Sequence, residues 1–223
     1  MKKGPIRAEE FMARLRSDPD WVRRMAELEK ARQVAAANYR EAVSPIIRDP
    51  VAAGIPVKGL HHLSKTVTRY EAAIPILLKH FRSSYPDGVR AAVASALAHR
   101  RSRNMAWEPL LRAYMLELNR SGPAPPGATG SPSSDKDGMA WALSEMARPD
   151  DIDQLIALIS DPANGPSRVF FVKNLSRSKS QRAFETLVRL SKDAEIAAEI
   201  ESKLKNKLRR QAKKDRARSA TRH

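Results

Sequence analysis

Apolar residues recur at helical spacing along most of this chain, whereas the strict alternation typical of strands is nearly absent. The clearest stretches are residues 70–81 and 89–97, which a Tyr-Pro-Asp turn at residues 85–87 separates. In the first stretch, apolar side chains three or four positions apart fall on one helical face: Ile74, Leu77, Leu78 and Phe81. The pattern predicts a hairpin of two short amphipathic helices.

Further amphipathic pairs follow downstream. The helices expected there cover residues 104–119, 135–147, 150–161, 166–178, 180–193 and 194–208. Residues 121–134 contain only glycine, proline, serine, alanine and threonine, and they predict a flexible surface loop inside one hairpin. With this loop set aside, the units repeat roughly every 33 residues, within the range of helical repeat proteins. One hairpin cannot bury its own apolar face, so we expect neighbouring hairpins to stack and form the core.

The first 69 residues follow a different pattern. A helix is expected from about residue 7 to residue 16. Asp18 and Pro19 then predict the start of a second helix over residues 21–43, because aspartate caps helices and proline is tolerated in their first turn. The apolar stripe of this helix is thin, so we expect it to lie across the repeats as an N-terminal cap.

Prolines and a glycine predict where that region changes direction. Ser44-Pro45 would open a new short helix, and Asp49-Pro50 would break or restart it. Gly54 would end the helix, since glycine adopts the left-handed conformation at little cost. A further short helix is expected over residues 60–70.

Residues 70–100 resemble a HEAT repeat. The matching features are Pro75 inside the first helix, Asp87 and Arg90 around the start of the second, and an alanine-rich run that ends at Leu97. The resemblance is looser over residues 104–208 and implies a stack of helical hairpins whose inner face, lined by the second helices, binds partners.

Pattern and resemblance together give the expected architecture. It is all-α: an α-α superhelix of stacked helical hairpins (a HEAT-like solenoid) with an N-terminal helical cap. The cap would comprise residues 1–69, the repeats residues 70–208 and a disordered basic tail residues 209–223. No stretch reaches the roughly 20 apolar residues that a membrane-spanning helix needs, and the start lacks the apolar run of a secretory signal. We therefore expect a cytoplasmic protein without a transmembrane segment.

Positive charge is the most unusual feature of the composition. The 223 residues carry a formal net charge of +16, and residues 202–223 hold ten basic side chains against one aspartate. Such a balance favours polyanions as partners. The densest basic cluster outside the tail is residues 99–103. The candidate polyanion-binding residues are Arg100, Arg101, Arg103, Lys203, Lys207, Arg209, Arg210, Lys213 and Lys214.

Four other residues could line a basic groove between the repeats. Arg90 and Arg168 open the second helices of two hairpins, where they either line a basic groove or bond neighbouring turns. Trp107 and Trp141 could line the same groove for a nucleic acid. At helical spacing, however, both tryptophans are more typical of the core.

No set of residues predicts catalysis. The chain has no cysteine and no His-Glu-x-x-His motif, and the adjacent His61 and His62 would point about 100° apart on a helix. Asp150, Asp151 and Asp153 cluster at a helix start, where capping explains them. Neither a phosphate-binding glycine loop nor a hydrolase Gly-x-Ser-x-Gly motif is present. We predict no catalytic residue, no cofactor and no metal.

Three functional hypotheses remain open. The first is a non-enzymatic scaffold that binds a protein partner in the groove of the repeat stack. The second is a nucleic-acid-binding protein acting through its groove or basic tail, in its enzymatic form similar to the HEAT-like DNA glycosylases for alkylated bases. The third is membrane-surface binding through the basic, partly amphipathic residues 196–218.

Overall fold

Helices account for all regular structure in a computed structural model that describes residues 7–63, 70–86, 88–116 and 135–205. The α-helices are α1 (Ala8–Ser17), α2 (Pro19–Ala52), α3 (Leu60–Leu63), α4 (Tyr70–Phe81), α5 (Val89–Ala96), α6 (Arg103–Leu116), α7 (Asp135–Met146), α8 (Ile152–Ser160), α9 (Val169–Arg177) and α10 (Gln181–Leu190). The 3₁₀ helices are η1 (Arg100–Ser102), η2 (Pro149–Asp151) and η3 (Pro162–Arg168). Residues 197–205 form a last helical segment. The all-helical prediction is confirmed for these ranges, and the predicted loop at 121–134 lies outside them.

Helix α2 runs without interruption through both of its internal prolines. Its start is as predicted, because the Asp18 carboxylate accepts hydrogen bonds from the backbone N–H groups of Asp20 and Trp21 at 2.9 and 3.3 Å. The predicted new start at Pro45 and break at Pro50 are wrong. Each proline removes one backbone hydrogen bond, but the Pro50 ring is buried against the body, and this packing offsets the loss.

The end of α2 lies where the sequence predicts it. Gly54 has φ 73°, in the left-handed region. The N–H of Gly54 donates to the carbonyl of Val51, and the N–H of Ile55 donates to the carbonyl of Pro50. These two bonds satisfy carbonyls that the helix end leaves open.

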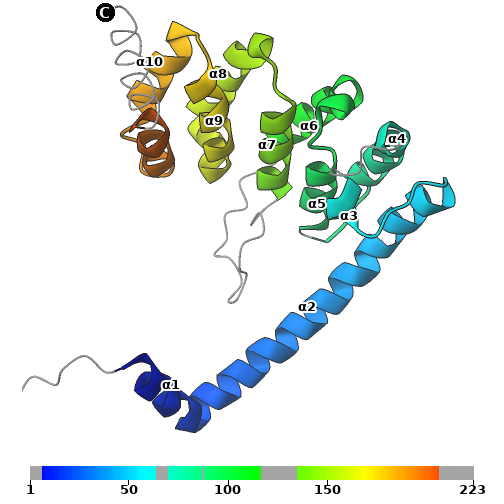
Figure 1. Ribbon diagram of the computed structural model, residues 1–223, viewed down its shortest axis with the longest axis vertical. Helices are drawn as coiled ribbons and strands as arrows, with labels where there is room; N and C mark the ends of the chain where they lie inside the picture. The colour runs from blue at the N-terminus through cyan, green and yellow to red at the C-terminus, as the bar shows by residue number, and fades with distance from the viewer. Residues whose placement is uncertain (1–6, 64–69, 87, 117–134, 206–223) are drawn as a thin grey trace, which may run out of the picture.

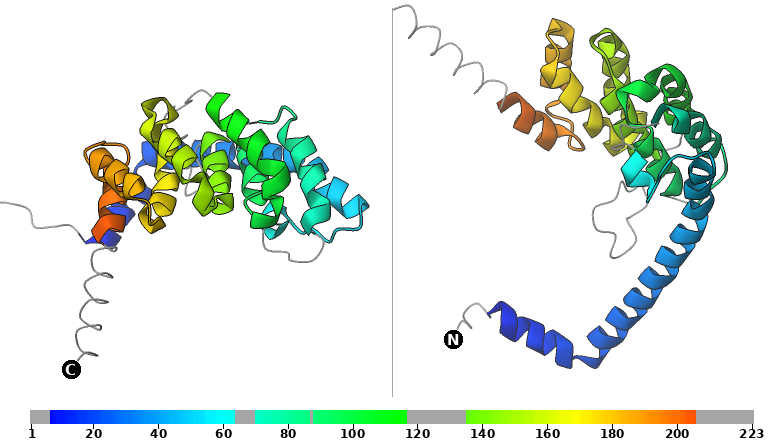
Figure 2. Two further views of the ribbon diagram at one scale, coloured as in Figure 1. Left: turned by 90° about the horizontal axis from the view of Figure 1, so that it is seen from above. Right: turned by 45° about the vertical axis from the view of Figure 1, so that its right-hand side comes forward.

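Most of α2 projects away from the rest of the molecule (Figures 1 and 2). Its buried residues are Val43, Ile46 and Pro50, all near its C-terminal end. These residues belong to the part of the helix that meets α4 and α5. The expectation that this helix lies across the repeats is therefore wrong, because only its C-terminal part is buried against them.

Helices α4 to α10 form the body of the molecule and succeed one another in a row (Figure 1). Within each pair, α4 packs on α5, α6 on α7 and α8 on α9. Between pairs, α4 contacts α6, α5 contacts α7, α7 contacts α9 and α8 contacts α10. One continuous apolar core runs through these contacts, and its fully buried members include Leu77, Leu97, Leu110, Leu143 and Phe171.

The tightest approach in the body is between α5 and α7. A Cβ atom added to Gly138 would lie 2.6 Å from both the Cα and the carbonyl oxygen of Ala91. One turn before Gly138, the Asp135 carboxylate accepts hydrogen bonds from the backbone N–H groups of Gly88 and Ala91 at 3.3 and 3.0 Å. Helix α7 therefore both packs against the start of α5 and satisfies its open N–H groups. Asp87, the cap expected from the sequence, lies outside the described residues.

Replacing Gly138 with alanine tests this contact. In an open helix the change would stabilise the protein by about 1 kcal/mol through helix propensity. Here the new methyl group meets backbone atoms that cannot rotate away, so we expect a net loss of about 2 kcal/mol, in the range of overpacked cores. Urea unfolding measures the difference, and a gain in stability would contradict the close approach.

Candidate functional site

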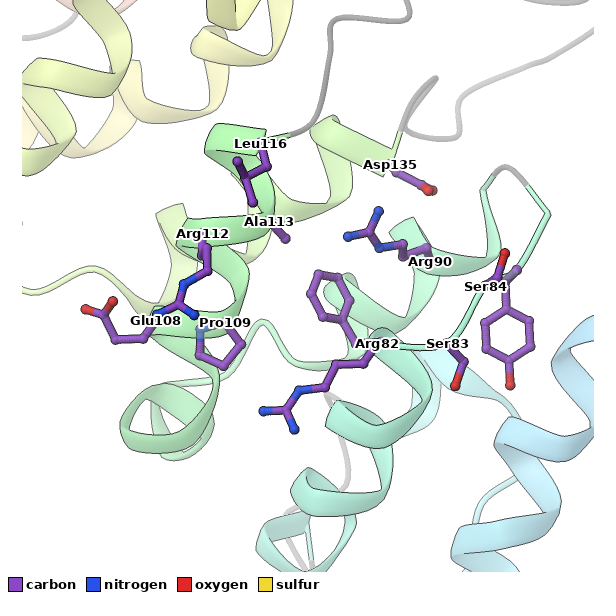
Figure 3. Close-up of a pocket in the computed structure, with 12 residues that line it drawn as sticks. Arg82, Ser83, Ser84, Arg90, Glu108, Pro109, Arg112, Ala113, Leu116 and Asp135 are labelled. Atoms are coloured by element: carbon purple, nitrogen blue, oxygen red, sulfur yellow. The ribbon is translucent and has the colours of Figure 1, made fainter.

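A pocket of about 860 Å³ opens between α4 and α6 (Figure 3). The end of α4, the segment that follows it and the first turn of α5 form one side, and α6 forms the other. Phe81, Pro109, Ala113 and Leu116 contribute apolar surface. The site therefore combines an apolar lining with the charged groups described next.

Three arginines line this pocket from three different segments. Arg82 follows α4, Arg90 lies in the first turn of α5 and Arg112 lies on α6 (Figure 3). The Arg90 guanidinium stands 4.9 Å from the centre of the Phe81 ring, a cation–π contact that holds it over the pocket lining. Arg82 and Arg112 are exposed, and no described carboxylate pairs with either of them. Such arginines suit carboxylate or phosphate groups, which they bind through paired N–H donors.

Two carboxylates border the same pocket. Glu108 lies one turn before Arg112 on α6, and Asp135 opens α7. The Asp135 carboxylate is directed at the N-terminal N–H groups of α5. The lining thus carries both signs of charge, with the arginines in excess.

A hydrogen-bonded chain fixes the segment between α4 and α5 to the end of α2. The buried His80 ring contacts the Asp49 carboxylate through Nε2 at 3.1 Å and the Tyr85 hydroxyl through Nδ1 at 2.7 Å. Burial, reinforced by the negative charge of Asp49, raises the pKa of Tyr85. Tyr85 lines the pocket with its hydroxyl protonated at neutral pH, so it can act there as a hydrogen-bonding group and not as a nucleophile.

The basic cluster predicted at residues 99–103 does not form one surface. Arg100 is exposed, and Arg101 approaches Glu71 at 3.7 Å. Arg103 is largely buried, bonds the Asp151 carboxylate at 2.6 Å and stacks on the Trp107 ring at 4.3 Å. Arg103 therefore joins two parts of the body. Lys203 pairs with Glu199 at 2.9 Å, and the other predicted polyanion-binding residues lie outside the described ranges: Lys207, Arg209, Arg210, Lys213 and Lys214.

Arg168 is also structural. Its side chain is 2% exposed and donates to Asp193 at 2.7 Å and to Glu195 at 2.6 Å. The same guanidinium donates to the carbonyl oxygens of Gly165 and Ile159. Of the two readings for this arginine, bonding of neighbouring turns is the one observed, whereas Arg90 lines the pocket.

The two tryptophans differ in their surroundings. Trp107 is 6% exposed and lies in the core, as expected. Trp141 is 41% exposed, so its assignment to the core is wrong. It packs edge-on against Phe170, and the Lys173 ammonium lies 5.9 Å from its ring centre. Helix α9 therefore covers the ring of Trp141 only in part.

The predicted aspartate cluster serves the backbone and ion pairs. Asp151 accepts a hydrogen bond from the N–H of Arg148 at 2.6 Å in addition to its bond with Arg103. Asp153 pairs with Arg182 at the surface. In the described ranges, no three histidine, aspartate or glutamate side chains converge so that they could hold a metal ion, and none of the helices is long and apolar enough to cross a membrane.

Sequence reasoning missed Arg82 and Arg112. Arg82 is a single arginine in the turn after α4, Arg112 is a single arginine on α6, and they lie in different hairpins. Only the packing of α4 against α6 brings them to one pocket. Comparison of the chain with protein-family models, curated proteins and solved structures finds no match.

Substituting methionine for Arg168 tests its structural role. Loss of the buried guanidinium removes both ion pairs and its hydrogen bonds to the carbonyl oxygens of Gly165 and Ile159, so we expect a loss of about 3 kcal/mol in unfolding free energy at pH 7. Changing Arg182 to methionine is the matched control. Its pair with Asp153 is exposed on both sides, so the change should cost less than about 1 kcal/mol.

The same pair predicts a pH dependence. The hydrogen bond from Arg168 lowers the pKa of Asp193 below its usual value. The stabilisation is therefore complete above the ordinary aspartate range and is lost as the pH falls through the lowered pKa. We expect the stability difference between wild type and the Arg168 variant to shrink as the pH falls from 7 to 3 in urea titrations. A constant difference would assign the effect to packing instead of charge.

Proposed function

We propose that the chain is a HEAT-like repeat scaffold without catalytic activity, which binds a protein partner through its surface grooves. Two features of the body support an α-α superhelix. Helices α4, α6, α8 and α10 come first in their hairpins. Among them, α4 contacts α6 and α8 contacts α10. Helices α5, α7 and α9 come second and contact one another in succession.

The observation that carries the proposal is the pair Arg82 and Arg112 beside an apolar pocket. A single exposed arginine needs no partner, because water solvates it. Here two arginines from different hairpins border one concave, partly apolar pocket, and together they form a recognition surface. Carboxylates are the groups that such arginines bind best in a protein partner. We infer that the pocket receives an acidic segment that also carries an apolar side chain.

The mixed charge of the pocket favours a protein over a nucleic acid at this site. Glu108 stands beside Arg112, and a regular row of phosphates would bring negative charge next to this carboxylate. A peptide can place its acidic and apolar groups at separate points and avoid that repulsion.

Nucleic-acid binding is the second candidate, and Trp141 favours it. Its exposed ring lies next to the cation of Lys173 on a chain of net charge +16. Exposed aromatic rings near positive charge can stack single-stranded bases. An alkylated-base glycosylase activity would be the enzymatic form of this candidate.

Reversing the charge of Arg82 and Arg112 together tests the scaffold. Proteins captured from a cell extract by the full chain and quantified by mass spectrometry should include a set that the Arg82→Glu/Arg112→Glu variant loses at least tenfold. The matched control is Arg182→Glu/Arg189→Glu, which changes net charge equally on the exposed face of α10. Equal loss in both variants would assign capture to overall charge and contradict a partner site at the pocket.

A salt series separates the two candidates. Binding of short single- and double-stranded DNA and RNA is measured for the full chain and for a chain that ends at Leu208. If the body is a protein-binding scaffold, binding should vanish with the basic tail. Steeply salt-dependent binding by the shorter chain, abolished by Trp141→Ala, would favour the nucleic-acid candidate.

A further inference from the structure

The free part of α2, residues 19–42, carries an apolar stripe that the body does not cover (Figure 1). The stripe consists of Trp21, Met25, Leu28, Ala35 and Tyr39, and Arg32 interrupts it. It continues the face on which Val43, Ile46 and Pro50 are buried against the body. Tyr39 is 42% exposed, and Trp21, Met25 and Leu28 are partly exposed.

The spacing of these positions is regular. Steps of four and three residues alternate from Trp21 to Tyr39 and continue through Ala42 to Ile46. This seven-residue repeat is typical of helices that wind around another helix in a left-handed coiled coil. Helix α2 contacts α1, α4 and α5, but a stretch of helix that packs on little else gains only modest stability from its own hydrogen bonds. The stripe therefore has the pattern of a surface that another helix covers.

We propose that α2 pairs with α2 of a second copy of this chain, antiparallel, with the twofold axis near residue 30. This register places Trp21 opposite Tyr39 of the second copy, and Met25 opposite its Ala35. Each pairing matches residues that fill the seam: an aromatic side chain with an aromatic one, and a large side chain with a small one. A parallel pair would place Ala35 against Ala35 and leave a gap.

Charge argues for the same orientation. Arg32 lies on the stripe and is 3.8 Å from Glu29 of its own helix. In a parallel pair the two Arg32 side chains would meet in one layer and repel each other. In the antiparallel register, Arg32 lies opposite Leu28 and beside Glu29 of the second copy. Arg32 and Glu29 from each of the two copies then alternate around the twofold axis, and their charges cancel.

The outer face of α2 carries exposed charged residues beside the exposed Val22 and Val34. Arg23, Lys30 and Arg40 lie away from the stripe and are exposed, as are Glu27 and Glu41. They would remain in water in the dimer. The inference is independent of the partner proposed for the pocket, because the stripe and the pocket share no residue.

Sedimentation equilibrium over a concentration series tests the dimer. Wild-type chain should reach twice the chain mass of 24.9 kDa. Leu28→Asp should shift the mass to that of a monomer, because it places a charge in the seam. The control Ala37→Asp makes the same change of charge on the opposite, exposed side of α2 and should leave the dimer intact. Both positions lie outside the core, so the thermal melting of the body should not change.

Cross-linking tests the orientation, since the chain has no cysteine of its own. An oxidised mixture of the Met25→Cys and Ala35→Cys chains should form a disulfide between the two variants, while either variant alone should not cross-link. Cross-linking of each variant alone would overturn the antiparallel register. A wild-type chain that stays monomeric over the whole concentration series would overturn the dimer and leave the stripe to a different protein.

Discussion

The close approach of α7 to α5 is the constraint on which the pocket depends. Gly138 allows the two helix backbones to meet, and Asp135, on the same helix, satisfies the open N–H groups of Gly88 and Ala91. The start of α5 is thereby held in place, and with it Arg90, which stands over the Phe81 ring at the pocket lining. The backbone contact between Gly138 and Ala91 thus helps to set the position of the Arg90 guanidinium at the pocket. A bulkier residue at position 138 would disturb both.

Some of the positive charge holds the body together. Arg103 and Arg168 reach from one pair of helices to the carboxylates of the next, at Asp151 and at Asp193 with Glu195. Both guanidiniums are largely removed from water, where an unpaired charge would be costly. Net charge alone therefore overstates the binding surface. Arg82 and Arg112 differ from these residues because they are exposed and no described carboxylate pairs with them.

Local patterns predicted the helices well and their surroundings poorly. The apolar spacing of residues 70–81 and the glycine at position 54 were sufficient to place α4 and the end of α2. The proline rule failed at Pro50 because burial against the body outweighs a local hydrogen bond. Trp107 and Trp141 show the same limit: both lie at helical spacing, but a neighbouring helix covers only one of them. Arg82 and Arg112 meet through packing between hairpins, which periodicity within a helix does not encode.

The long projecting helix and the pocket become related once two copies are paired. Residues 19–42 of α2 span about 36 Å at 1.5 Å per residue, so an antiparallel pair would hold two bodies at opposite ends of a stiff rod. Each body carries its own pocket, where the exposed Arg82 and Arg112 are the proposed contacts for a partner. A partner with two acidic segments at matching separation would bind far more tightly, since the second contact forms at high effective concentration. The rod would then select partners by the distance between their acidic segments, which neither pocket can measure alone.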